Sequence, residues 1–265
     1  MPKLFNIGVA LTAGFYFFAF AARGGDTNSC PPVAEIIRKL IGRSQETPSC
    51  LAQLEYSFTK LTEREEFDSK GRVKDRKSSS NEMFFSSGVI SKKPNANPAD
   101  AKRTESPGKS GSTKSAKPKP ATRGESVNLL TDEILGKYVF TLVNRTNLNG
   151  RLAFELSFQP KKKNSSGKNL MERLLNRTTG KLWIDVEEFE LARMQVQLDS
   201  EMLVGAGLIG SLKKAVFILE RARLPEGFWF ERSVKTDYEA RKFLESTRVI
   251  TRSESSDFRK RARKG

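Results

Sequence analysis

The feature that most constrains the fold of this chain is a repeated alternation of apolar and polar residues. Its cleanest example runs from Leu152 to Phe158, where four large apolar side chains alternate with Ala153, Glu155 and Ser157. A period of two is that of a half-buried strand. The same pattern recurs over residues 54–59, 138–142 and 191–198, and residues 72–85, 180–185, 212–223, 228–238 and 243–251 complete the set of predicted strands. These segments predict eight or nine strands.

Turn signals separate the strands, and helical patterns are few. Asn147–Gly150 is a strong hairpin signal, and Asp68–Gly71 and Pro225–Gly227 are further turns. Short helices are expected over residues 33–41, 129–137 and 169–176, the first ending at Gly42. No strand–helix–strand alternation is sustained, so the pattern predicts a mainly β (α+β) fold with one strongly curved antiparallel sheet.

The absence of histidine restricts the chemistry. The chain holds no His and two Cys, which excludes Ser-His-Asp triads, Cys-His pairs, His-ligated metals and a Cys₄ zinc site. We therefore expect no enzyme and no cofactor. The catalytic alternative would use carboxylates, in the cluster Glu63–Asp68 or the pair Glu187–Glu188. Both are expected at hairpin ends, where charged groups are usually solvated.

The formal charge of +16 is concentrated in two segments. Residues 92–125 hold nine Lys or Arg against three acids, and residues 259–264 hold five basic residues. The range 88–127 is rich in Lys, Pro and Ser and poor in large apolar side chains, so it is predicted to be a disordered insert. The insert is either a solubilising segment or a basic linker for polyanions. Residues 259–265 are predicted to be a basic tail.

The N-terminus predicts export. Residues 1–22 combine a basic start, an apolar run from Ile7 and the small-x-small site Ala19-Phe-Ala21, as in a secretory signal peptide. A retained anchor and a lipoprotein acceptor at Cys30 are the alternatives. In an oxidising compartment we expect Cys30 and Cys50 to form a disulfide that joins the first helix to the strand after it. A reactive pair is the alternative, although the spacing is far from Cys-x-x-Cys.

Gly205-Ala-Gly207-Leu-Ile-Gly210 satisfies the dinucleotide-binding fingerprint. That fingerprint has meaning between a strand and a helix of a βαβ unit, whereas this one lies between two strand patterns. We interpret it as a flexible apolar link or bulge at the rim of a curved sheet. Its aliphatic side chains, with Leu203 and Val204, could also touch an apolar ligand or a membrane.

Several segments, taken in order, resemble a known family. They include Tyr56-Ser-Phe-Thr59 with the turn at Asp68–Gly71, and the paired segments from Tyr138 and Asn149. Later ones are Gly180-Lys-Leu-Trp-Ile-Asp185, the run 203–214 and Ser253–Phe258. Over residues 33–85 and 129–260 the chain resembles bacterial LolA/LolB-like outer-membrane lipoprotein-sorting proteins. The basic insert departs from that pattern.

The resemblance implies a single domain over residues 30–260. Its sheet would form a half-open barrel with short helices over its mouth, and its apolar cavity would take acyl chains. It further implies a periplasmic protein, associated or not with the outer membrane, without catalytic residues. The implied partner is an acyl lipid or lipoprotein, and we expect a monomer that binds no nucleic acid.

The cavity candidates are the large apolar residues of the alternating segments. They are Phe154, Leu156, Phe158, Trp183, Met194, Val196, Leu198, Phe217, Leu219 and Phe230. The alternative for each of them is ordinary core packing, and Tyr56 and Phe58 are similar cases. Two functions remain: an acyl-chain carrier, or a scaffold whose basic insert and tail hold anionic lipid or another polyanion.

Overall fold

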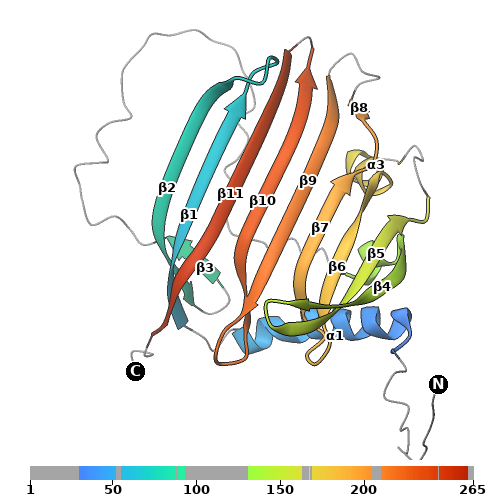
Figure 1. Ribbon diagram of the computed structural model, residues 1–265, viewed down its shortest axis with the longest axis vertical. Helices are drawn as coiled ribbons and strands as arrows, with labels where there is room; N and C mark the ends of the chain where they lie inside the picture. Colours follow the sequence, from blue (N-terminus) through green and yellow to red (C-terminus); the bar gives the residue numbers. More distant parts are fainter. Residues whose placement is uncertain are drawn as a thin grey trace, which may run out of the picture. The chain divides into compact units, whose positions relative to one another are not determined.

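A computed structural model describes residues 30–51, 55–86, 89–92, 131–162, 167, 169–204, 210–243 and 245–261. The described elements, in chain order, are α1 (Val33–Leu51), β1 (Glu55–Phe67), β2 (Val73–Ser86), β3 (Val89–Lys92), α2 (Asp132–Leu135), β4 (Tyr138–Leu148), β5 (Arg151–Pro160), α3 (Leu170–Leu175), β6 (Thr178–Asp185), β7 (Leu191–Leu198), β8 (Met202–Val204), β9 (Gly210–Arg223), β10 (Trp229–Lys242) and β11 (Glu245–Lys260) (Figure 1).

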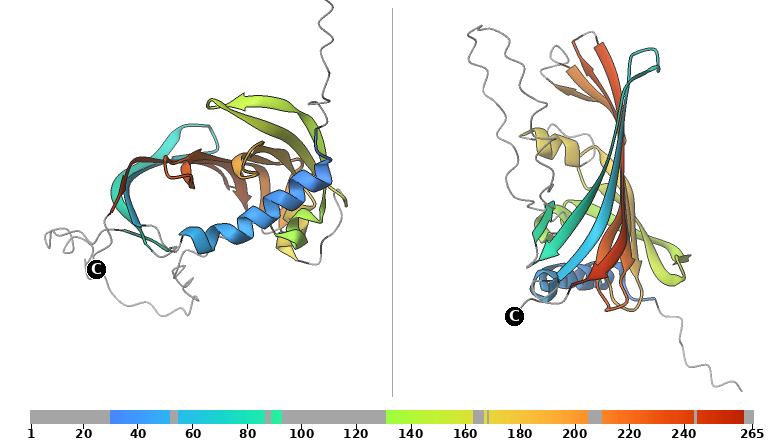
Figure 2. Two further views of the ribbon diagram at one scale, coloured as in Figure 1. Left: turned by 90° about the horizontal axis from the view of Figure 1, so that it is seen from below. Right: turned by 90° about the vertical axis from the view of Figure 1, so that its left-hand side faces the viewer.

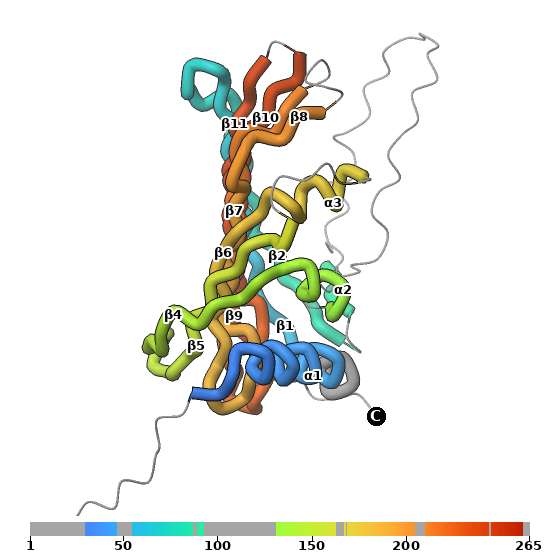
Figure 3. Tube along the Cα trace, turned by 90° about the vertical axis from the view of Figure 1, so that its right-hand side faces the viewer, coloured from blue at the N-terminus to red at the C-terminus, as the bar shows by residue number. Residues whose placement is uncertain are grey.

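The strands form one antiparallel sheet, as predicted, but it has 11 strands in place of the eight or nine expected. Its order is β3-β2-β1-β11-β10-β9-β7-β6-β5-β4, with β8 paired to β9 outside this path. Among the described strands β3 and β4 are the two edges, so the sheet is curved but open. The curvature is plain in the view from below, where α1 crosses the open side of the arc (Figure 2). Helices α2 and α3 lie on that same side (Figure 3).

Hairpin chemistry sets the order of neighbouring strands. In the β4–β5 turn Leu148 pairs with Arg151, while Asn149 and Gly150 both have positive φ, 54° and 85°. A two-residue type I′ turn needs exactly two such residues, and Asn-Gly supplies them at low cost. No hairpin turn explains the pairing of β1 with β11, because these strands come from opposite ends of the chain.

Helix α1 is longer than predicted. It spans 19 residues and does not end at Gly42. A glycine inside a helix costs only about 1 kcal/mol, so Gly42 by itself does not end α1. The buried residues of the helix, Ile36, Leu40 and Ile41, all precede Gly42 and anchor its first half. Among the described residues, no helix is both long and apolar enough to cross a membrane.

The long helix argues against the predicted disulfide. Cys30 is a free cysteine, and Cys50 lies near the opposite end of α1. The helix separates Val33 from Cys50 by about 25 Å. The residues between Cys30 and Val33 span at most about 11 Å, whereas the two Cα atoms of a disulfide lie within about 7 Å.

Reduction is therefore expected to leave the thermal stability unchanged. A disulfide across this short loop would contribute about 3 kcal/mol. Melting curves recorded by circular dichroism with and without dithiothreitol should then coincide. A fall of several degrees in Tm on reduction would show that the two cysteines are joined.

Other predicted segments lie partly or wholly outside the described residues. Residues 1–22 of the signal peptide lie outside them, as does most of the insert. Within the predicted insert 88–127 the structure places strand β3, which pairs with β2, so the prediction of disorder is wrong for residues 89–92. Likewise β11 includes Arg259 and Lys260, which the composition placed in the basic tail.

Gly210, the last residue of the fingerprint motif, has a structural role. Residues 205–209 lie outside the described residues, but the strands on either side, β8 and β9, pair antiparallel. The motif therefore does not open a helix of a βαβ unit. A Cβ atom on Gly210 would lie 2.2 Å from the carbonyl oxygen of Arg241. Glycine allows the close approach of β9 and β10 there.

Candidate functional site

An apolar pocket of about 270 Å³ lies between the helix-covered face of the sheet and two short helices. The helices contribute Ile134 and Leu135 from α2, and Met171, Leu174 and Leu175 from α3. The strands contribute Tyr138, Phe140, Phe158, Thr178, Leu182, Met194, Val196 and Phe217. Eleven of these thirteen side chains are aliphatic, thioether or phenyl groups, so the pocket suits an apolar ligand.

Strand alternation places the pocket residues. On β7, Met194 and Val196 face the pocket, while Gln195 and Gln197 line a groove on the opposite face. The same alternation extends to the neighbouring strands, because paired residues lie on the same face. Val196 is paired with Phe217 on β9 and with Gly180 on β6. The apolar residues of four strands, β5, β6, β7 and β9, thus meet on one face.

The two hydroxyl groups in the lining are satisfied. The hydroxyl of Tyr138 donates to the carbonyl oxygen of Leu175 at 3.1 Å and lies 2.8 Å from the hydroxyl of Thr178. Thr178 also donates to Leu175, at 3.1 Å. Burial raises the pKa of Tyr138, so the phenol stays neutral. The polar atoms are used within the wall, which leaves the cavity surface apolar.

Gly180 makes room for the ring of Phe158. The two residues are paired across β5 and β6, and a Cβ atom on Gly180 would lie 2.7 Å from Cζ of Phe158. The same Cβ would lie 2.0 Å from the carbonyl oxygen of Gln195 on β7. The absence of a side chain at position 180 therefore determines where Phe158 sits in the pocket wall.

Gly180→Ala is expected to destabilise the protein by about 1–3 kcal/mol, the usual cost of overpacking. The added methyl group collides with backbone that cannot move without breaking the β6–β7 ladder. Urea unfolding of this variant measures the loss. Gly42→Ala is the matched control, because a Cβ there meets nothing within 4 Å and favours the helix. Equal stability of Gly180→Ala and the unsubstituted protein would contradict this account.

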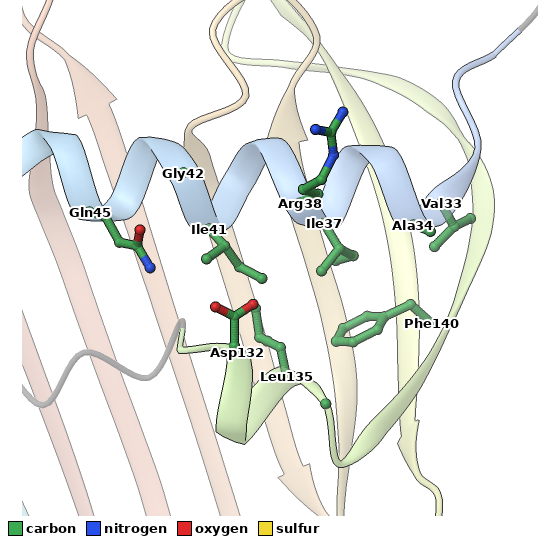
Figure 4. A pocket seen from close by; sticks show the side chains of 11 residues that line it. Val33, Ala34, Ile37, Arg38, Ile41, Gly42, Gln45, Asp132, Leu135 and Phe140 are labelled. Atoms are coloured by element: carbon green, nitrogen blue, oxygen red, sulfur yellow. The ribbon is translucent and has the colours of Figure 1, made fainter.

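A second, larger groove adjoins the pocket. It has a volume of about 690 Å³ and lies between α1 and α2. Figure 4 shows Ile37 and Ile41 of α1 directed toward Leu135 and Phe140 across it. Leu135 and Phe140 also line the apolar pocket, so the two cavities share a wall.

The structure divides the ten predicted cavity residues into four groups. Phe158, Met194, Val196 and Phe217 line the pocket. Phe154 and Leu156 are 1% and 0% exposed and are core residues. Leu198 and Leu219 lie on the pocket face by register, outside the lining. Phe230 and Trp183 lie elsewhere.

Phe230 belongs to a separate core cluster. Its ring centroid lies 5.0 Å from that of Phe58 and 5.8 Å from that of Phe85, and Tyr56 and Leu224 complete the cluster. Phe230 lies in the packed core, which is the alternative stated for it above. Tyr56 and Phe58 belong to the same core.

Trp183 is on the wrong face for the pocket. Its neighbour Leu182 lines the pocket, so the pleat of β6 turns Trp183 to the opposite face. There the guanidinium of Arg193 lies 4.9 Å from the ring centroid, in a polar groove with Lys181 and Gln195. Alternation along β6 is compatible with Leu182 as the lining residue. Trp183 was predicted in its place because its side chain is larger. The sequence predicts α2 and α3 as short helices, but it does not indicate which of their side chains line the pocket.

No protein-family model matches the sequence, and no curated protein matches it. Solved structures do match. A DUF1329 family protein from Desulfovibrio piger is 14% identical, with 86% of this chain and 95% of that chain covered and a TM-score of 0.35. A LolA superfamily protein from Nitrosomonas europaea is 12% identical, with 86% and 93% covered and a TM-score of 0.33. The MucA/MucB complex of Pseudomonas aeruginosa matches at 11%, covering 86% and 99%, with a TM-score of 0.26. The family that the sequence resembles is thus among the structures found.

The carboxylates of the catalytic alternative are held by arginines. Glu187 accepts from Arg151 at 3.0 Å, and Glu188 accepts from Arg223 at 2.7 Å. In the other cluster Glu65 is bonded to Arg76 and Arg252. The side-chain hydrogen bonds from Arg76 and Arg252 lower the pKa of Glu65. These contacts link neighbouring strands and hairpins, which is a structural role.

Proposed function

We propose that this protein is a non-enzymatic, periplasmic carrier that binds the acyl chains of a lipid or lipoprotein. The observation that carries the proposal is the apolar pocket under α2 and α3, whose two hydroxyl groups are already hydrogen-bonded within its wall. Such a pocket offers a ligand no free polar group, and this suits an acyl chain. Phe158, Met194, Val196 and Phe217 are the contacts foreseen from the sequence.

The energetics support a carrier. Burying one methylene contributes about 0.8 kcal/mol, so six buried methylenes contribute about 5 kcal/mol. That is enough to hold a chain and still release it. The adjoining groove between α1 and α2 gives the rest of a longer chain an apolar surface.

Native mass spectrometry tests the proposal. The protein is exported with its own signal, purified without detergent and measured intact, and its lipids are then extracted. We expect co-purified acyl lipid or lipopeptide in near-stoichiometric amount. An empty protein that also fails to take up a fluorescent fatty acid would overturn the carrier function.

The alternative is a scaffold that holds anionic lipid or another polyanion through the basic insert and tail. Its support is compositional, nine basic residues against three acids over residues 92–125. Deleting residues 91–126 separates the two functions. A carrier keeps its acyl ligand without the insert, whereas a scaffold loses binding to anionic vesicles. Salt would weaken the scaffold interaction steeply.

A further inference from the structure

The face of the sheet that holds the pocket changes character from one side to the other. One cross-strand row runs from Val196 on β7 to Phe217 on β9, then to Thr236, Thr251 and Arg64 on β10, β11 and β1. The next row runs from Leu219 through Val234 to Ser253 and Thr62. Both rows are apolar at the pocket and carry hydroxyl groups beyond it.

The hydroxyl groups begin next to the pocket. Neighbouring strands are about 4.8 Å apart, so Thr236 lies one strand spacing from the pocket residue Phe217. Thr251 lies about 10 Å from Phe217 along the same row. This is the distance at which the headgroup of an amphiphile would lie if its acyl chain entered the pocket.

The hydroxyl groups are available. Among the described residues, neither Thr236 nor Thr251 makes a side-chain hydrogen bond, and both are half-buried on the curved face. In the next row, the hydroxyls of Thr62 and Ser253 lie 3.1 Å apart and bond to each other. The hydroxyl groups of Thr236 and Thr251 can therefore both donate hydrogen bonds to a polyol and accept them from it.

The charges beyond the hydroxyls are balanced. Arg64 forms an ion pair with Glu66 at 3.3 Å, and its row partner Lys77 forms one with Asp75 at 3.0 Å. A bare anion would compete with these carboxylates, whereas an uncharged headgroup would not. The charge pattern therefore favours hydroxyl groups over a free carboxylate as the polar part of the ligand.

We propose that the ligand is an amphiphile with a hydroxyl-bearing headgroup, such as a glycerol or sugar ester, which bonds to Thr236 and Thr251 while its acyl chain fills the pocket. This inference rests on the proposed function, because it needs the chain in the pocket. It adds the chemical class of the headgroup and two specificity residues.

The test compares two probes with the same chain, monopalmitoylglycerol and palmitate. Their affinities are measured by displacement of a fluorescent fatty acid from the full-length protein. Two hydrogen bonds at about 0.7 kcal/mol each give a preference of about tenfold for the glycerol ester. The double variant Thr236→Val/Thr251→Val should lose this preference and bind palmitate as before. Valine suits a strand, so the variant is expected to fold.

The matched control is Thr141→Val/Thr179→Val, which removes two hydroxyls from the groove on the opposite face. It should keep the preference. Binding of both probes with equal affinity by the unsubstituted protein would overturn the headgroup inference alone. A preference that survives in Thr236→Val/Thr251→Val would do the same. Failure of both probes to bind at all would overturn the proposed function as well.

Discussion

Val196→Trp is expected to reduce acyl-chain binding by about tenfold or more. Val196 is half-buried in the pocket wall, between Gly180 and Phe217, so an indole ring at this position fills space that a ligand would occupy. Losing the burial of two methylenes already removes about 1.6 kcal/mol, which exceeds a factor of ten. Titration with a fluorescent fatty acid measures the loss.

The next residue along β7 supplies the control. Gln197 is exposed on the opposite face, where it lines the polar groove. Gln197→Trp adds the same ring to the same strand and should leave acyl binding within about twofold, a change of about 0.4 kcal/mol. Equal losses in both variants would mean that tryptophan harms β7 in general and that the pocket is not the site.

Asp185→Ala is expected to lower the free energy of unfolding by about 3 kcal/mol. The Asp185 side chain is 1% exposed and accepts two hydrogen bonds from Arg151, at 2.6 and 2.9 Å. It also accepts from the backbone N–H groups of Glu187 and Glu188, at 3.0 and 2.8 Å. The substitution leaves all of these donors without their acceptor, and the β6–β7 turn loses its anchor to β5. Urea unfolding measures the change.

Glu187→Ala is the matched control for Asp185. The Glu187 side chain is 78% exposed and pairs with the same guanidinium at 3.0 Å. An exposed pair of this kind contributes about 0–1 kcal/mol. If Glu187→Ala cost as much as Asp185→Ala, burial of the carboxylate would not be the reason for its effect.

The contribution of Asp185 should also depend on pH. Burial by itself would raise the pKa of Asp185, but the hydrogen bonds from Arg151 and from the backbone outweigh it and hold the pKa below its ordinary value. A carboxyl with a lowered folded-state pKa stabilises above its unfolded pKa of about 3.9, and that contribution is lost as pH falls through the folded pKa. The stability difference between the unsubstituted protein and Asp185→Ala should therefore be constant near neutral pH and shrink below about pH 4. A constant difference down to pH 2 would contradict the assignment.

How far the sequence predicts the pocket depends on which interactions place each residue. Phe158, Met194, Val196 and Phe217 could be chosen because they lie in strands with clear alternation. The same reasoning chose Trp183 by size, although its neighbour Leu182 holds the pocket position. Phe230 could not be separated from the core, because its place depends on contacts with Phe58 and Phe85 from distant strands.

The antiparallel sheet could be predicted from the sequence, because alternation and turn chemistry are local properties of neighbouring residues. Asn149 and Gly150 illustrate this, since their positive φ angles form the tight turn that pairs Leu148 with Arg151. The pairing of β1 with β11 and the face that the helices cover do not follow from local patterns. These depend on contacts between segments far apart in the chain, and no local pattern encodes which distant apolar surfaces will meet.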